Sequence, residues 1–453
     1  MAQAWVSKLN LWSLAGRSAL LQDLGFRNYW ISRALSSTAF NAVNYSFLIL
    51  VVRETGSTIY TSLLILSIIL PAATLASVSG VVTDRLPRGL LLFVAHLLRA
   101  LLATAFVASN GSVWVIYGIA LGFGVVGQFS GPVEAALLPH IVERERLTSA
   151  NSLFNLGGAV GQVLGVLVLA PLFLKTAGTD SLFTLVAMLY LVAAAMLLTV
   201  PNLGFRHLSA AQRHSSHATF RGVRTEFAEG WQALRRDRTA YMSMMLLVLG
   251  TTSLLVTVAV APRFANEILG IATENAIYVF APAAAGILLG LRLVDWLTRQ
   301  VSKAWVVTAG FVMVVLSMVA MAMVPQSARL LENQNPLGLF SPGPFGTTAA
   351  RVMVTLVFAA LAGFAFSVIN VGGRSLLNER VPVPMQGRVF AAQTVLSNLA
   401  SIVPLLLVGA LADWWGVSPV LIVMAIAILA AALLGTFQTM RSEMADRGDH
   451  GQR

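Results

Sequence analysis

Long apolar stretches recur along the chain between short polar or charged segments. A helix needs about 20 mostly apolar residues to cross a bilayer, and twelve stretches have that character. They are residues 26–52, 58–82, 90–108, 113–138, 150–174, 181–200, 241–261, 275–296, 303–324, 349–370, 389–412 and 418–437. The pattern predicts an all-α integral membrane protein with twelve transmembrane helices.

A polar gap at 201–240 divides the predicted helices into two sets of six. Charged segments at 137–151 and 376–390 hold corresponding places in the two sets, which indicates two pseudo-symmetric six-helix bundles. The second set contains a longer Pro/Gly-rich loop at 325–348. We therefore predict an interfacial segment at 1–25, bundles at 26–200 and 241–437, a cytoplasmic linker with an amphipathic helix at 201–240, and a cytoplasmic tail at 438–453.

The composition agrees with a lipid environment and excludes several classes of function. Hydrophobic residues make up 57% of the chain and charged residues 11%, against about 45–50% and 25% in soluble proteins. The chain has no cysteine, and its histidines are scattered. No GxxxxGK[ST] motif occurs, and no Ser/His/Asp cluster or acidic pair lies at membrane depth. We therefore expect no metal site, no cofactor and no enzyme activity.

The basic residues predict the orientation in the membrane. The formal net charge is +11, and most Lys and Arg residues fall on the same side as both termini. The opposite side holds only Arg53, Lys175, Arg263, Arg329 and Arg351. Because basic loops stay in the cytoplasm, we expect a multi-pass protein of the cell membrane with both termini cytoplasmic. The positive charge is expected to face anionic membrane lipids and not nucleic acid.

The loop between the second and third predicted helices carries a family resemblance. Gly80, Asp84, Arg85 and Arg88 match the GxxxDRxxR signature of the major facilitator superfamily. With segments 31–37, 97–106, 137–153 and 381–390, the chain resembles the branch that contains macrolide exporters and the bacterial enterobactin exporter. The resemblance implies the major facilitator fold and a monomeric secondary transporter that exports hydrophobic or amphipathic small molecules by alternating access, coupled to protons.

Two departures from the family pattern concern this coupling. The fourth helix lacks the arginine usual in proton-coupled drug antiporters, and the fifth lacks their Gly-Pro motif. The candidate proton carriers in the inner half of the bilayer are Glu134 and His96, and Arg99 lies one turn from His96. In the alternative reading, Glu134 is a permanently ionised partner of an arginine.

Polar residues within the predicted helices mark a candidate substrate path, because each costs free energy in a bilayer. The candidates lie near mid-depth or share a helical face: Arg33, Asn41, Asn44, Gln128, Gln162 and Asn398. Together with aromatic residues such as Phe40 and Phe154, they suit a bulky amphipathic substrate. Interhelical hydrogen bonding between the same amides is the alternative. A stripe of Gly157, Gly161 and Gly165 on the fifth helix is expected to serve close helix packing.

The resemblance also implies an inner gate that joins the two bundles on the cytoplasmic side. Asp84 would accept hydrogen bonds from the amino end of the eleventh helix, where the helix dipole favours an anion. Arg85 or Arg88 would reach Glu134, and Gly80 would allow close approach of the helices. In the alternative, the two arginines only anchor the loop and Asp84 caps a helix.

Two other functions compete with drug, macrolide or siderophore export. Related transporters move lipids or lysophospholipids, and the same fold would serve that substrate. A non-transporting membrane sensor is a different class, but a sensor would typically add a soluble domain, and the largest predicted segment outside the membrane is the gap at 201–240.

Overall fold

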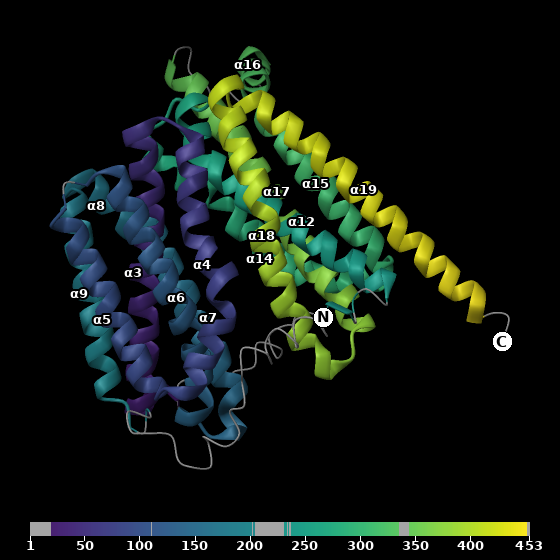
Figure 1. The fold of residues 1–453 in the computed structure, drawn as a ribbon. Coiled ribbons are helices and arrows are strands. Elements are labelled where there is room, and N and C mark those ends of the chain that lie inside the picture. The colour runs from purple at the N-terminus through teal and green to yellow at the C-terminus, as the bar shows by residue number, and fades with distance from the viewer. Residues whose placement is uncertain are drawn as a thin grey trace, which may run out of the picture. The chain divides into compact units, whose positions relative to one another are not determined.

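The computed structural model describes residues 20–109, 111–201, 203, 231–232, 234, 237–334 and 344–450. Within these residues all regular structure is helical (Figure 1). The first 19 residues of the predicted interfacial segment and most of the predicted linker lie outside the described residues.

The helices follow the predicted apolar stretches. In chain order they are α3 (Leu24–Thr55), α4 (Thr58–Arg85), α5 (Arg88–Val107), α6 (Val113–Ile141), η1 (Arg144–Arg146), α7 (Leu147–Val163), η2 (Leu164–Leu169), α8 (Ala170–Thr176), α9 (Thr179–Leu198), α12 (Arg238–Glu267), η3 (Thr273–Asn275), α13 (Ala276–Phe280), α14 (Pro282–Gln300), α15 (Lys303–Ala322), α16 (Val324–Gln334), α17 (Pro344–Arg380), α18 (Val383–Trp415) and α19 (Val417–His450). Eleven helical stretches of the described chain are long and apolar enough to cross a membrane. The remaining predicted span is α4, whose described apolar part is Thr58–Ala72.

Two local features differ from the sequence expectation. The fifth predicted helix is not uniform: a π-helical turn, η2, separates α7 from α8. The predicted loop at 325–348 begins as a helix, α16, in which Ala328 is fully buried while Leu330 is exposed. The loop was predicted because the later part of this segment is rich in Pro and Gly. The first residues of the segment include good helix formers, and these form α16.

The chain forms two compact units. The first unit comprises Met1–Phe47 and Thr74–Gly222, and the second comprises Leu48–Ala73 and Val223–Arg453. The carboxyl end of α3 and the start of α4 therefore belong to the second unit, although both helices lie in the amino-terminal half of the sequence. The predicted bundle boundaries at 26–200 and 241–437 stay a prediction.

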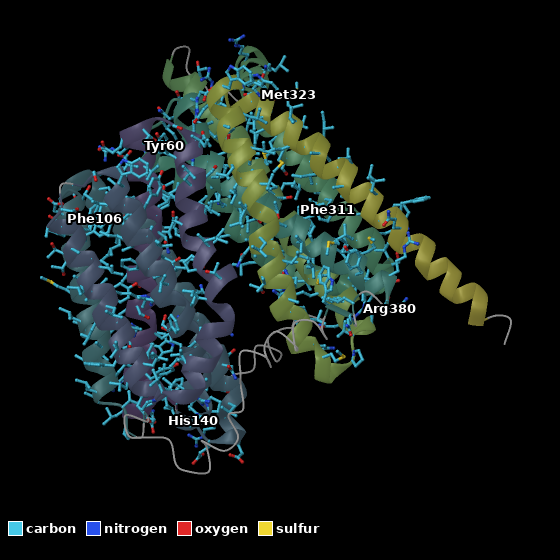
Figure 2. The ribbon with its side chains drawn as sticks, viewed as in Figure 1. Tyr60, Phe106, His140, Phe311, Met323 and Arg380 are labelled. Carbon is cyan, nitrogen blue, oxygen red and sulfur yellow. The ribbon has the colours of Figure 1, made fainter. Side chains whose placement is uncertain are left out.

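An aromatic cluster forms the core of the first unit near one end. The rings of Phe106 and Phe183 stack with centroids 4.0 Å apart, and Phe47 lies 5.2 Å from Phe183 and 6.4 Å from Phe123. These residues come from α3, α5, α6 and α9, of which α5 and α9 run side by side (Figure 1). Figure 2 places Phe106 and His140 toward opposite ends of this unit. The cluster thus fixes four helices at the end remote from His140.

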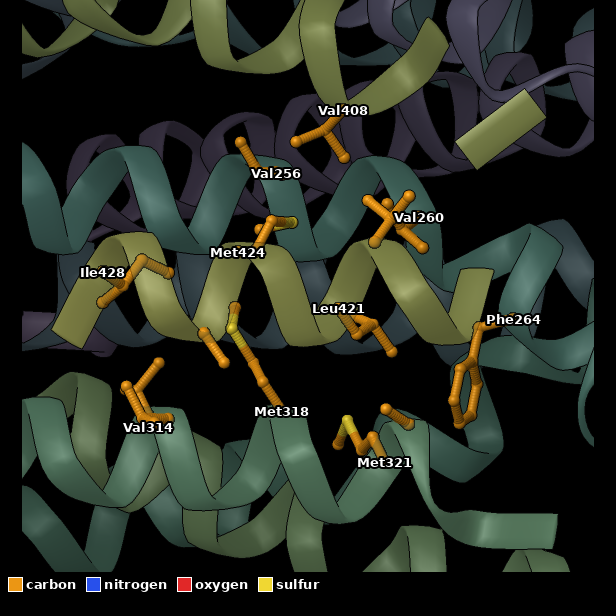
Figure 3. Close-up of a cluster of buried hydrophobic side chains, with 14 of the residues drawn as sticks. Val256, Val260, Phe264, Val314, Met318, Met321, Val408, Leu421, Met424 and Ile428 are labelled. Carbon is orange, nitrogen blue, oxygen red and sulfur yellow. The ribbon is translucent and has the colours of Figure 1, made fainter. Parts of the chain in front are cut away.

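The core of the second unit lies between α12, α15 and α19. Val314, Met318 and Met321 on α15 face Leu421 and neighbouring residues on α19 (Figure 3). Their spacing of three to four residues places them on one helical face. Among the described residues, apolar packing of this kind forms the core of the second unit.

The glycine stripe of α7 and η2 packs against α3 inside the first unit. A methyl group added at Gly157 would lie 2.9 Å from Nε1 of Trp30, and one at Gly161 would lie 2.8 Å from the carbonyl oxygen of Ala34. At Gly165 it would overlap the carbonyl oxygen of Thr38. The two helix backbones therefore approach too closely for any side chain at the last two positions.

Candidate functional site

A cavity of about 470 Å³ lies within the first unit, beside the contact between α3 and α7. Four helices supply its walls, because polar residues recur at helical spacing on the faces they present to one another. The lining residues are Arg33, Ser36, Ser37, Phe40, Asn41, Arg99, Ser130, Glu134, Asn155, Gly158, Ala159 and Gln162. The volume lies within the range of pockets that hold drug-sized ligands, about 300–1,000 Å³.

Arg33 and Glu134 form an ion pair in this cavity. The Nη1 of Arg33 donates to Oε2 of Glu134, whose side chain is 6% exposed. The Arg33 guanidinium also lies over the ring of Phe154, 4.6 Å from its centroid. Tyr29 donates its hydroxyl to the backbone carbonyl of Glu134 and so fixes α6 against α3. The pair provides the buried carboxylate with a counter-ion, which its burial requires.

Arg99 enters the same cavity from α5, about 16 Å along the helix axis from Arg88. It is 6% exposed, and its Nη2 donates to the hydroxyl of Ser130 at 2.9 Å. The guanidinium carbon lies 5.3 Å from the centroid of Phe40 and 5.7 Å from that of Tyr190. Unlike Arg33, Arg99 makes no ion pair with a carboxylate in the described part of the chain.

His96 is buried one turn from Arg99 but does not line the cavity. Its Nε2 lies 3.5 Å from the hydroxyl of Ser32, and its ring lies 6.0 Å from the ring of Tyr190. Ser32 in turn donates to the carbonyl of Ala193 at 2.8 Å. The structure thus places His96 in the packing between α3, α5 and α9.

The predicted substrate-path residues divide into two groups. Arg33, Asn41 and Gln162 line the cavity together, whereas Asn44 and Gln128 are half-buried outside its lining. Asn398 lies on α18 in the second unit and is also half-buried. These placements leave the proposed path open to test.

Asn41 lines the cavity and makes its hydrogen bonds within α3. Its amide donates to the carbonyl of Ser37 at 2.8 Å and lies 3.3 Å from the Ser37 hydroxyl. Ser37 itself donates to the carbonyl of Gly158 at 2.9 Å. The hydrogen bond across the contact between α3 and α7 therefore comes from Ser37, beside the Asn41 amide.

The sequence did not single out two of the serines in the lining. Ser130 lies one helical turn before Glu134 on α6, and Ser36 adjoins Ser37 on α3. The i, i+4 spacing of Ser130 and Glu134 was the signal that would have identified the first. Arg99 and Glu134 were predicted as coupling residues, and the structure brings them into the cavity that contains the predicted path residues Arg33, Asn41 and Gln162.

The loop signature is only partly visible. The side chains of Asp84 and Arg85 are not among those that the structure describes, and neither is the packing at Gly80, so the predicted Asp84 contact and the Arg85 alternative stay predictions. Arg88 is described, and its Nη1 donates to the carbonyl of Ala136 at 3.3 Å and lies 3.5 Å from Nε2 of His140.

In this structure Glu134 pairs with Arg33 and Arg88 has other partners, so the expected reach of Arg85 or Arg88 to Glu134 stays a prediction. The reason for the different partners is depth. Glu134 lies about 10 Å along the axis of α6 from its last residue, Ile141. Arg88 is the first residue of α5 and meets the end of α6 instead.

A second polar cluster lies within the second unit, and the sequence analysis missed it. Asp413 of α18 accepts hydrogen bonds from the backbone N–H groups of Thr58 at 2.6 Å and Ile59 at 3.2 Å, and from the Ser57 hydroxyl. Arg263 of α12 forms an ion pair with the same carboxylate. Asp413 thus caps the amino end of α4 in place of a local N-cap residue.

Comparison with known proteins shows the family to which the chain belongs. A model described as Major Facilitator Superfamily matches residues 29–333. The uncharacterized MFS-type transporter YfiS of Bacillus subtilis (strain 168) is 24% identical over 367 residues, which cover 79% of this chain and 79% of YfiS. The uncharacterized MFS-type transporter Mb0038c of Mycobacterium bovis (strain ATCC BAA-935 / AF2122/97) is 26% identical over 377 residues, which cover 81% of this chain and 79% of Mb0038c.

Solved structures agree on the fold. The crystal structure of the nucleoside transporter NupG matches with a TM-score of 0.66 and 14% identity, over 91% of this chain and 98% of NupG. A bacterial homolog of the human lysosomal transporter Spinster, solved in an inward-facing and unoccupied conformation, matches with a TM-score of 0.68 and 12% identity, over 93% of this chain and 98% of that chain. The helices, the cavity and the match over residues 29–333 lead to one conclusion: the chain is a multi-pass membrane protein that belongs to the Major Facilitator Superfamily, a family of secondary transporters and not of enzymes.

Proposed function

We propose that this transporter exports hydrophobic or amphipathic small molecules by alternating access, coupled to protons, as the macrolide and enterobactin exporters that its sequence resembles would do. The observation that carries the proposal is the cavity of about 470 Å³, where serines, amides and an ion pair meet the ring of Phe40. A mixed lining of this kind suits a ligand with apolar and polar parts. Glu134, paired with Arg33, supplies a carboxyl group within the same space that can take up a proton.

The proposed orientation places both termini in the cytoplasm of a cell-membrane protein. The distribution of Lys and Arg residues among the loops supports it. In this orientation α5 begins, and α6 ends, at the cytoplasmic face, so Arg88 and His140 lie near the inner headgroups.

A flux assay tests the proposal. Purified protein is reconstituted into liposomes, and entry of a fluorescent dye, a macrolide, a catecholate siderophore and a lysophospholipid is measured with and without an imposed pH gradient. We expect protein-dependent flux of at least one amphipathic compound, stimulated by a gradient of the polarity that drives export. Liposomes without protein give the background, and absence of flux above it for the whole panel contradicts the proposal.

Lysophospholipid transport is the second candidate, and one observation favours it. Phe40 and Ala159 place apolar surface in the same cavity as the charged groups. An acyl chain could lie along these residues while its head group enters the cavity. The lysophospholipid arm of the flux assay separates this candidate from drug export.

A further inference from the structure

Arg99 is a buried cation that forms no ion pair in the described part of the chain, although Glu134 lines the same cavity. Its guanidinium has a neutral hydrogen-bond partner, Ser130, and two aromatic neighbours, and its Nε atom is buried without any hydrogen-bond partner. A charged group at membrane depth is costly unless an opposite charge meets it. The rings of Phe40 and Tyr190 offset only part of this cost, because a cation–π contact is weaker than a hydrogen-bonded ion pair.

The lining of the cavity as a whole carries a net positive charge. Its lining contains the two guanidinium groups of Arg33 and Arg99 but a single carboxylate, Glu134. That carboxylate is already paired with Arg33. The Nε of Arg33 is also buried and has no hydrogen-bond partner among the described residues. The lining therefore carries an excess of one positive charge and donor groups that no acceptor of the described chain uses.

We propose that the cavity binds the anionic group of an amphipathic substrate, a carboxylate or a phosphate, with Arg99 as its principal ligand. The inference rests on the proposed transport function and names the substrate class for it. Guanidinium groups match the paired oxygens of carboxylates and phosphates. Arg33 contributes a second positive charge from α3, and the hydroxyl groups of Ser36 and Ser130 add polar surface to the same lining.

The apolar part of such a substrate has a place beside this charge. Phe40 and Ala159 line the cavity next to the polar groups. The substrate head can come from a free organic anion or from the head group of an anionic lysophospholipid, and both present the same chemistry to Arg99.

Binding of three head groups to the purified protein tests the inference. The protein is held in nanodiscs of phosphatidylcholine, which carry no net charge, and binding is followed by tryptophan fluorescence, with Trp30 on α3 as an internal probe. The ligands are dodecyl phosphate, lauroyl lysophosphatidylglycerol and dodecyltrimethylammonium, which share a chain of the same length. We expect at least one of the two anionic ligands to bind about tenfold or more tightly than the cation.

Variants of Arg99 test whether the preference for anionic ligands arises in the cavity. Arg99→Gln keeps a donor for Ser130 but removes the charge, and we expect it to weaken anion binding about 10- to 100-fold. Arg99→Lys keeps the charge and is expected to retain part of the affinity. Arg27→Met is the matched control, because Arg27 lies exposed on α3, outside the cavity lining. It should leave binding unchanged.

The possible outcomes separate the inference from the proposed function. Equal binding of cation and anions by the wild-type protein overturns the inference, even if Arg99→Gln fails to fold. Anion binding that Arg99→Gln leaves unchanged also overturns it. If anions bind through Arg99 but no compound crosses liposomes, the site stands and the transport proposal fails. If cations or neutral compounds are transported without anion binding, the transport proposal stands and the site fails. Preference for the phosphate or for the lysolipid identifies the source of the head group.

Discussion

Arg33 and Glu134 hold opposite charges within a cavity whose other lining residues, apart from Arg99, are uncharged. A buried ion pair contributes little net stability, because desolvation offsets the attraction, but the loss of one partner leaves an uncompensated charge. Here Arg33 is 26% exposed, so solvent can screen part of that charge. The ion pair can therefore separate when Glu134 takes up a proton or when an anion competes for Arg33.

Replacement of Glu134 by Gln tests its part in coupling. Gln cannot take up or release a proton, so we expect the variant to lose most of the stimulation of transport by a pH gradient while it retains gradient-independent exchange. The measurement is substrate flux in liposomes at equal protein content, with and without the gradient. Glu143→Gln is the control, because that side chain is 76% exposed. Full stimulation in Glu134→Gln would remove the residue from the coupling role.

The residues of this cavity show which parts of the site the sequence could predict and which it could not. Helical spacing predicted that Arg33 and Asn41 share a face of α3, and the structure places both in the lining. Periodicity along one helix says nothing about its rotation relative to neighbouring helices. The pairing of Glu134 with Arg33, 101 residues away, and the place of Gln128 outside the lining therefore required the fold.

At the level of helices, the contact between α3 and α7 depends on the absence of side chains. Gly161 and Gly165 let the two backbones approach, and Ser37 donates across the contact to the carbonyl of Gly158. The π-turn η2 begins directly after α7 and contains Gly165. π-turns interrupt the regular hydrogen-bond ladder and often occur at functional sites. Because Gly165 lies in this turn, its close contact with α3 holds the turn in place.

Gly165→Ala should therefore destabilise the protein. Its methyl group would overlap the carbonyl oxygen of Thr38, and backbone shifts of this kind cost about 1–3 kcal/mol. Gly118→Ala is the matched control, because Gly118 is also helical and nothing lies within 4 Å of a methyl group there. We expect the midpoint of thermal unfolding in detergent to fall for Gly165→Ala and to stay equal or rise for Gly118→Ala. An unchanged midpoint for Gly165→Ala would contradict the close contact.

At the level of the whole chain, the apolar stretches marked the helices, because apolar length alone marks a membrane span. The helix ends were not predictable: α17 runs to Arg380, beyond the stretch at 349–370. The sequence places the boundary between the bundles in the polar gap, and this boundary stays a prediction. The second compact unit also includes Leu48–Ala73 from the first half of the sequence. Apolar length carries no information on which helices pack together. The ion pair of Arg263 with Asp413, far apart in the chain, therefore had no sequence signal.

The Asp413 cluster yields a prediction for the stability of the second unit. Asp413→Asn retains a carbonyl acceptor for the N–H groups of α4 but loses the charge that Arg263 meets. Hydrogen bonds to charged groups contribute about 1.5–3 kcal/mol, and we expect the lower part of this range because the Asp413 side chain is 25% exposed. The measurement is the midpoint of thermal unfolding, and Asp180→Asn, an exposed acid in the first turn of α9, is the control. An equal loss in both variants would contradict a specific role for Asp413.

The cap that Asp413 places on α4 also sets an order of events during synthesis. Thr58 and the carboxylate that caps its N–H are 355 residues apart. At about 5–20 residues per second, the ribosome needs about 20–70 s to deliver that carboxylate after the start of α4 has been made. During this interval the amino end of α4 must be satisfied by water, lipid headgroups or an insertion factor. Nascent chains halted before residue 413 should therefore hold this part of α4 loosely, and release of the complete chain should protect it from proteases.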